Sequence, residues 1–219
     1  MSRKELCKRY LLLIAGVFFV GLGIAIARRS DLGISPVSSV ANVLSLKWDI
    51  FSMGTWLMLW NCLIILMEIA ILRRNFKPIQ LLQFPISLLL GVCTDIGVWM
   101  VAVLPADGYV LRLLWILVSV PVLALGITLM VISNTVMNVG EAFVDVVSKV
   151  LHKSFGTVQV VFDISCVTLS VLLSLLLFDG TVVGTREGTF IAAFCTGLVV
   201  KWMTKRLKAP IEKCIIDTP

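Results

Sequence analysis

Two aspartates lie inside long apolar stretches of this chain, where a charged side chain is costly. Asp95 falls within the apolar run 80–104, and Asp163 falls within the run 155–178. Ionisable groups at membrane depth mark ion or proton sites, or they pair with a polar group on a neighbouring helix. Because burial favours the neutral carboxyl, proton binding is one chemistry open to both residues. We expect Asp95 and Asp163 to be coupling acids, with an interhelical hydrogen bond or ion pair as the alternative.

Polar side chains also gather around two short interruptions between apolar runs. Each interruption contains a glycine and opens a segment, 36–46 or 141–152, that is too short to cross a membrane but has one polar face. Ser35 before Pro36 is a favourable helix start, because Ser caps a helix and Pro fits its first turn. We expect solute-binding side chains here and on the neighbouring spans: Ser35, Ser38, Asn42, Asn61, Asn134, Asn138, Glu141 and Asp145.

The two short segments have two interpretations at this stage. Each is a half-helix whose N-terminal amides face a cavity, as in many carriers, or an amphipathic helix that lies in the membrane interface. In the first case Arg28 and Arg186, both expected on the outer side, could recognise a carboxylate or another anion. The alternatives for these arginines are lipid headgroups, or for Arg186 an ion pair with Glu187.

No constellation of residues indicates an enzyme. The one histidine, His152, lies at the expected cytoplasmic interface, and the six cysteines contain no CxxC motif or other metal-ligand spacing. There is no P-loop, and no Ser or Cys has a general base beside it in the sequence. We therefore expect no catalytic residues, no metal and no cofactor.

The elements that must hold these side chains are membrane helices. Of the 219 residues 59% are hydrophobic, and the mean hydropathy is +1.03, whereas a soluble domain is about 45–50% apolar. Six apolar runs are long enough to cross about 30 Å of hydrocarbon as helices. They are 10–28, 50–72, 80–104, 110–133, 155–178 and 188–205. The sequence predicts an all-α polytopic membrane protein with six transmembrane helices plus two short half-helices.

The net charge of +6 resides mainly in the joints between these runs. Basic clusters lie before the first run, between the second and third, before the fifth and after the sixth, so all four share one side if six spans alternate. By the positive-inside rule both termini are then cytoplasmic. This distribution argues against nucleic-acid binding. The expected partners are membrane lipid and a small-molecule solute, and the sequence leaves open whether the protein forms a homodimer.

The two halves of the chain resemble each other. With an offset of 107, Gly33 matches Gly140 and Ser38 matches Asp145; with an offset of 102, Asn61 matches Asp163. The second offset also aligns Ser52, Gly54 and Thr55 with Ser154, Gly156 and Thr157. Each half then contains three spans, an odd number, so the second half must be inverted relative to the first. Such an inverted 3+3 repeat is typical of secondary transporters.

Three small-residue motifs carry a resemblance to a known family. GLGIAI at 21–26 leads into LGISP at 32–36, and GTREGT at 184–189 opens the last span. In these motifs the chain resembles the YczE/YyaS/YitT family of bacterial integral membrane proteins, closest to its YczE-like branch. The family tends to have an aromatic residue and an acid after the proline, where this chain has Val37 and Ser38. The resemblance covers most of the chain and implies a multi-pass protein of a bacterial plasma membrane, commonly labelled a transporter, with no established substrate.

These observations predict a single membrane domain over 1–219. Repeat one is expected at about 10–104, repeat two at about 110–206, and a basic cytoplasmic tail at 207–219. The predicted function is secondary transport of a small polar or anionic solute, with proton coupling through the intramembrane acids as an option. The alternatives are a membrane-embedded substrate-binding subunit of a larger transporter, as in vitamin capture, and an accessory membrane protein that transports nothing.

Overall fold

The computed structural model describes residues 3–76 and 78–215, and this part of the chain is almost entirely helical. Isolated backbone pairing between Gly33 and Thr185 joins the two loops that precede α2 and α8. The α-helices are α1 (Arg3–Arg29), α2 (Pro36–Lys47), α3 (Met53–Leu72), α4 (Gln83–Val101), α5 (Tyr109–Ser133), α6 (Val139–Leu151), α7 (Phe155–Leu177) and α8 (Glu187–Ile215). Two 3₁₀ turns, η1 (Arg73–Asn75) and η2 (Pro78–Leu82), connect α3 to α4.

The structure confirms the all-α polytopic architecture. Five of the described helices are long and apolar enough to cross a membrane, namely α1, α3, α4 with its preceding turn, α5 and α7. The sixth expected span, α8, is a helix of 29 residues, but it is less apolar because Lys201, Lys205 and Arg206 lie along its second half. Large apolar side chains such as Leu176 (80% exposed) and Phe194 (73%) point outward, as they do on a surface that lipid covers.

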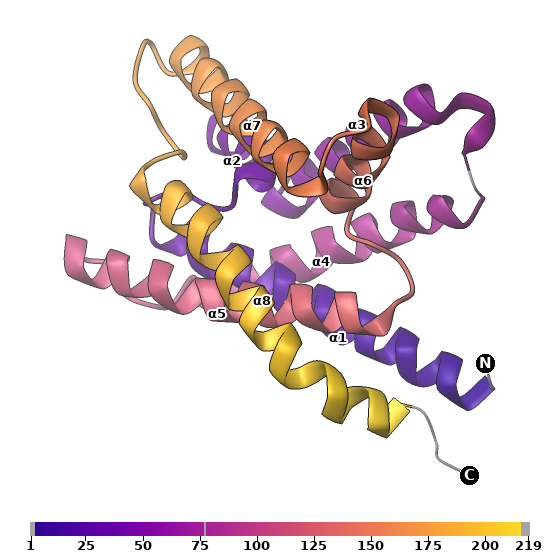
Figure 1. Ribbon diagram of the computed structural model, residues 1–219. Coiled ribbons are helices and arrows are strands. Elements are labelled where there is room, and N and C mark those ends of the chain that lie inside the picture. The colour runs from indigo at the N-terminus through magenta and orange to yellow at the C-terminus, as the bar shows by residue number, and fades with distance from the viewer. Residues whose placement is uncertain (1–2, 77, 216–219) are drawn as a thin grey trace.

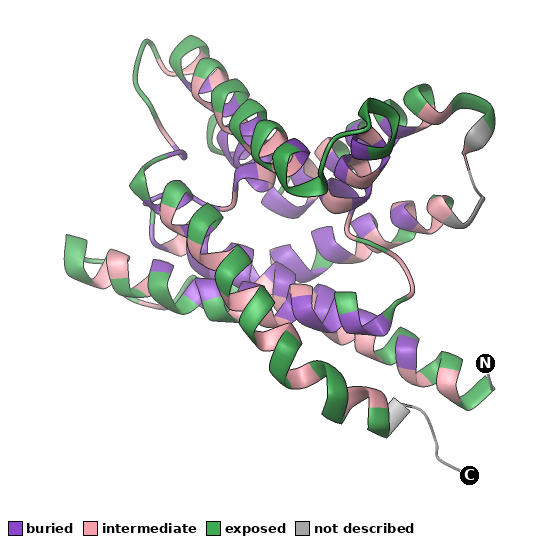
Figure 2. Ribbon diagram, in the orientation of Figure 1, coloured by how far each residue is buried: buried purple, intermediate pink, exposed green. Residues whose placement is uncertain are grey.

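The helices form two layers, which Figure 1 shows from the side. The lower layer contains α1, α4, α5 and α8, and the upper layer contains the two short helices α2 and α6 together with α3 and α7. The described N- and C-terminal ends lie on the same side of the molecule. The most buried segments are α2 and the central turns of α1 and α5 (Figure 2), so the core lies where the two layers meet.

The lower layer is organised by close antiparallel packing of α1 on α5. A Cβ atom on Gly16 would lie 2.9 Å from the carbonyl oxygen of Gly126, and one on Gly126 would lie 2.7 Å from that of Gly16. Further along, Gly23 is pressed against the backbone of Leu123. Small residues allow such backbone approach, which is the main source of helix association in lipid.

The packing repeats between the halves, as an inverted repeat requires. α1 packs on α4 as α5 packs on α8, α2 packs on α3 as α6 packs on α7, and α2 contacts α7 as α6 contacts α3. The caps repeat as well. Ser52 Oγ accepts a hydrogen bond from the Thr55 amide at 3.1 Å, and Ser154 Oγ accepts one from the Thr157 amide at 3.2 Å.

The structure corrects the register of the two short helices. Their caps, Ser35 (φ −57°, ψ 147°) and Asn138 (φ −60°, ψ 146°), have the same backbone conformation, which gives an offset of 103 rather than 107. Ser38 therefore corresponds to Glu141, and Asn42 rather than Ser38 corresponds to Asp145. The error is four residues, about one helical turn, so both registers present the same face and the sequence pattern did not distinguish them.

Candidate functional site

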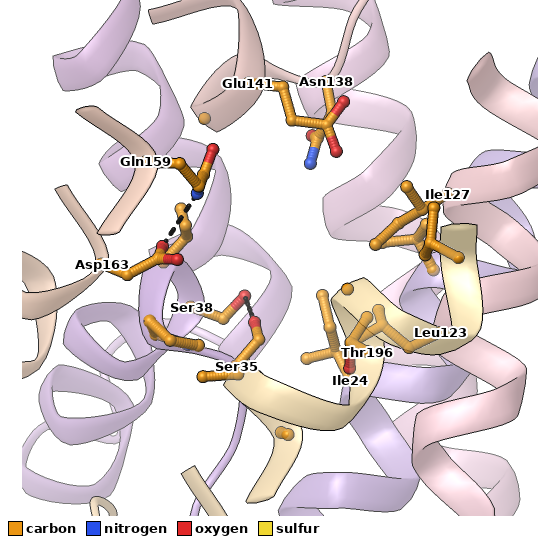
Figure 3. Close-up of a pocket in the computed structure, with 18 of the residues that line it drawn as sticks. Ile24, Ser35, Ser38, Leu123, Ile127, Asn138, Glu141, Gln159, Asp163 and Thr196 are labelled. Atoms are coloured by element: carbon orange, nitrogen blue, oxygen red, sulfur yellow. Dashed lines mark hydrogen bonds between the residues drawn. The ribbon is translucent and has the colours of Figure 1, made fainter. Parts of the chain in front are cut away.

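A cavity of about 470 Å³ lies between the two layers, and all eight helices contribute to its lining. Its polar side chains come mainly from the upper layer, and Figure 3 shows most of them around the central space. They are Ser35 and Ser38 at the start of α2, Asn61 on α3, Asn138 and Glu141 at the start of α6, Gln159 and Asp163 on α7, and Thr196 on α8.

Both short helices begin at this cavity. Pro36 is the first residue of α2 and lines the cavity, and the cap of α6, Asn138, lines it from the other repeat. Ser35 Oγ donates to Ser38 Oγ at 3.1 Å, while Asn138 Oδ1 accepts from the Val139 amide at 3.0 Å. For α2 the geometry supports the half-helix interpretation, because this helix is enclosed by α3, α7 and α8 rather than lying on a surface.

Two carboxyl groups face the cavity without a basic partner. Gln159 Nε2 donates to Asp163 Oδ1 at 3.0 Å, one helical turn away on α7. Glu141, in the first turn of α6, makes no ion pair with any described residue, and burial raises the pKa of its carboxyl. Among the described residues that line the cavity, none is Lys or Arg. The electrostatic character of the site is therefore acidic.

Several polar groups of the lining have no hydrogen-bond partner. Asn61 is only 3% exposed, and its amide makes no hydrogen bond to any described residue. The Oε1 atom of Gln159 and the Oγ1 atom of Thr196 are buried and unpaired. Buried polar groups in proteins are normally satisfied, so the unpaired groups here are available to a water molecule or a ligand that can hydrogen-bond.

The opposite wall of the cavity is apolar. Ile24 of α1 and Leu123 and Ile127 of α5 face the acidic side chains across the space in Figure 3. The site thus combines one polar wall with one hydrocarbon wall, the usual composition of a small-molecule site. Among the described residues, no group of three or more His, Cys, Asp or Glu side chains is placed to hold a metal ion.

Six of the predicted solute-binding or coupling residues come together here: Ser35, Ser38, Asn61, Asn138, Glu141 and Asp163. The others lie elsewhere. Asp95 caps α3 instead, accepting hydrogen bonds from Ser52 Oγ at 2.5 Å and from the Gly54 amide at 2.7 Å. Asp145 pairs with the exposed Lys149 on its own helix. For Asp95, the structure favours the hydrogen-bonding alternative.

The residues expected to recognise an anion also lie outside the cavity. Arg28 donates to Ser45 Oγ at 2.6 Å, and Arg186 is half-exposed with Glu187 at 3.5 Å. Asn42 donates to the Gly184 carbonyl at 3.0 Å, which fixes α2 against the loop before α8. Asn134 lines a smaller cavity of about 240 Å³ beside the start of α6, which also touches Glu141.

Sequence reasoning missed three residues. Gln159 lies one helical turn before Asp163, so its place on the same helix face as an intramembrane acid could have identified it. Thr196 lies directly before Gly197 in an apolar run, where a polar residue was the available signal. The third is Glu68 on α3, which is fully buried and accepts hydrogen bonds from Gln80 at 2.6 Å and Gln83 at 3.1 Å. The turn that brings these glutamines back onto α3 is a tertiary feature.

The two repeats differ at the ends of the cavity. In the first, α3 and α4 touch backbone to backbone, because a Cβ on Gly54 would lie 1.9 Å from the Gly91 carbonyl oxygen. In the second repeat, the equivalent of Gly54 is Gly156. A Cβ atom added to Gly156, or to Gly197 on α8, would have no atom within 4 Å. Helices α7 and α8 lie apart in Figure 1. α3 and α4 are therefore in backbone contact beside the cavity, whereas α7 and α8 are not packed against each other at Gly156 and Gly197.

The fold and the cavity define a polytopic helical membrane protein with a central cavity lined by two carboxyl groups. The chain belongs to a family of unknown function, DUF6198, whose model matches residues 7–205. Neither the curated proteins nor the solved structures contain a match to the chain.

Proposed function

We propose that this protein is a secondary carrier that moves a small solute across the membrane by exposing the central cavity to each side in turn. One observation supports this proposal above the others. The two repeats have corresponding helices and capping residues, yet α3 and α4 are in contact where their counterparts α7 and α8 are apart.

An inverted repeat supplies two arrangements of similar free energy. If the two halves exchange their conformations, α7 closes on α8 and α3 leaves α4, and the cavity then opens at the opposite end. A ligand that binds both arrangements is carried across as the equilibrium fluctuates. Gly156 and Ala193 correspond to Gly54 and Gly91 under the offset of 102, so the second pair has side chains small enough to allow the same close approach.

The setting of the carrier follows from the sequence. The distribution of Lys and Arg supports termini in the cytoplasm, and the resemblance to the YczE/YyaS/YitT family supports a bacterial plasma membrane. The cavity would then be open toward the cytoplasm, because α7 begins on the side where the described chain ends lie. Proton coupling is part of the proposal, with Asp163 and Glu141 as the titrating groups in the cavity.

Cysteine labelling tests the alternation. Thr196→Cys, in a chain with its native cysteines replaced, places a thiol in the cavity. We expect a membrane-impermeant maleimide to label it from either side of the membrane. Asp179→Cys, in the exposed loop after α7, is the control that labels from one side only.

A second variant gives the test a direction. Gly156→Val fills the space into which α8 would move, so we expect it to confine labelling of Thr196→Cys to the side on which the cavity is now open. One-sided labelling in the absence of Gly156→Val would contradict alternation. That outcome would favour the substrate-binding subunit, which captures a solute but does not carry it.

A further inference from the structure

The cavity contains more hydrogen-bond acceptors and negative charge than its own residues satisfy. Asp163 receives one hydrogen bond, from Gln159, and Glu141 makes no ion pair with any described residue. Gln159 Oε1 is a buried acceptor with no donor. Since the described lining has no Lys or Arg, an occupant is the source of hydrogen-bond donors, and of positive charge when the carboxyls are ionised.

Helix N-termini oppose this acidity but are too weak to cancel it. The starts of α2 and α6 each contribute about half a positive charge, whereas the two carboxyls, once both are ionised, contribute two negative charges. The sum leaves about one negative charge in the cavity. Some of the N-terminal amides already have acceptors within the protein. The Val139 amide donates to Asn138 Oδ1, and the Ser38 amide donates to the Ser35 carbonyl.

Asn61 provides an independent sign of a ligand. Its side chain is buried (3% exposed) and lines the cavity, and the side-chain amide makes no hydrogen bond within the described part of the chain. It occupies the position of Asp163 in the first repeat. The equivalent positions of the two repeats therefore carry one amide and one carboxyl group, and both line the cavity.

The apolar wall restricts the rest of the occupant. Ile24, Leu123 and Ile127 lie across the cavity from Asp163 and Gln159 (Figure 3), so a bound molecule meets hydrocarbon on the side away from the carboxylates. A hydrated metal ion would leave that wall without a contact. An amine with an apolar body satisfies both walls.

We propose that the solute is a monovalent organic cation, an ammonium group attached to a small apolar body, with Asp163 and Glu141 binding the ammonium. This inference rests on the proposed function only in treating the bound molecule as the transported solute. The cation-binding site itself does not depend on transport. It replaces the anionic solute expected from Arg28 and Arg186, since neither guanidinium reaches the cavity.

A charge series of matched shape tests the proposal. The probes are phenethylamine, 2-phenylethanol and phenylacetate, which share a ring and a two-carbon or one-carbon arm but are cationic, neutral and anionic; butylamine, butanol and butyrate form a smaller set. Binding is measured by calorimetry and by the unfolding midpoint of the full chain in lipid nanodiscs. We expect the amines to bind and raise the midpoint, and the alcohols and acids to bind at least tenfold more weakly.

Variants locate the binding. Asp163→Asn keeps the shape of the side chain but removes its charge, and we expect it to weaken amine binding by about tenfold to a hundredfold. Glu141→Gln should act in the same direction. Asp179→Asn is the control, because it removes a carboxylate from the exposed loop between α7 and α8. Asn tolerates the positive φ of +52° at this position, so the variant should fold normally and leave the affinity for amines unchanged.

Each outcome bears on one claim. Preferential binding of the acids, or amine binding that survives both Asp163→Asn and Glu141→Gln, overturns the cation site but not the carrier. Proton release or uptake on titration without binding of any amine identifies a proton site alone and also overturns it. Amine binding without labelling of Thr196→Cys from both sides preserves the cation site and refutes the carrier.

Discussion

Replacing Gly54 by Ala should disrupt the contact that closes one end of the cavity. The added Cβ would lie 1.9 Å from the carbonyl oxygen of Gly91 and 2.6 Å from its carbonyl carbon, whereas an ordinary contact begins near 3.4 Å. Both groups belong to the backbone, so no side-chain rotation relieves the overlap. The helices α3 and α4 must separate, which also lengthens the hydrogen bond from the Gly54 amide to Asp95.

The size of the effect follows from two opposing terms. Overpacking costs about 1–3 kcal/mol, and Ala in place of Gly inside a helix recovers about 0.5–1 kcal/mol. Because the overlap is with backbone atoms, the overpacking cost is in the upper part of its range, and the net cost of about 1–2 kcal/mol changes a conformational equilibrium by about 5–30-fold. For a chain of this length it lowers the unfolding midpoint by about 2–8 °C.

The measurement is the thermal unfolding midpoint of purified protein in detergent, with Gly156→Ala as the matched control. Gly156 is the repeat counterpart of Gly54, but a Cβ there meets no atom within 4 Å, so its midpoint should stay level or rise slightly. Equal loss of stability in the two variants, or no loss in Gly54→Ala, would refute the inference that the halves differ at these ends.

Three further predictions follow from other contacts. Glu68→Ala removes the acceptor of the buried Gln83 amide, so we expect a loss of about 1–3 kcal/mol in unfolding free energy, with Glu68→Gln less harmful. Asn42→Ala removes the 3.0 Å hydrogen bond to the Gly184 carbonyl and should cost a similar amount, measured as a lower unfolding midpoint; an unchanged midpoint would show that this bond does not hold α2 in place. For Glu141, the folded-state pKa is raised by burial above its ordinary value of 4.5, so the unfolded chain ionises first as the pH rises. Stability should therefore be greatest below pH 4.5 and fall as the pH rises toward the raised pKa, and Glu141→Gln should flatten this part of a midpoint-against-pH curve.

Local sequence determined the helices themselves. The apolar runs predicted the long helices to within a few residues at most ends, because hydrocarbon leaves a backbone no partner except itself. Capping residues determined where helices begin: Ser52 and Ser154 cap α3 and α7, and Ser35 with Pro36 starts α2. These signals act over a few residues and are visible without a fold.

Only the tertiary structure decided which polar residues share a site. Asp95 and Asp163 are both aspartates within apolar runs, yet the first caps a neighbouring helix and the second faces the cavity. The difference depends on which helix lies opposite each side chain. The same holds for Glu68, whose partners return to it only through the 3₁₀ turns between α3 and α4.

The alignment of the two short helices and the unequal packing of the two repeats also could not be predicted from the sequence. A shift of one helical turn leaves the pattern of polar and apolar faces almost unchanged, so the sequence paired Ser38 with Asp145, and the caps of the folded helices pair it with Glu141. Gly54 and Gly156 are equivalent in the sequence. One is pressed against a neighbouring backbone and the other faces open space, because the free energy of a whole helix pair, and not the preference of one residue, selects which end of the cavity closes.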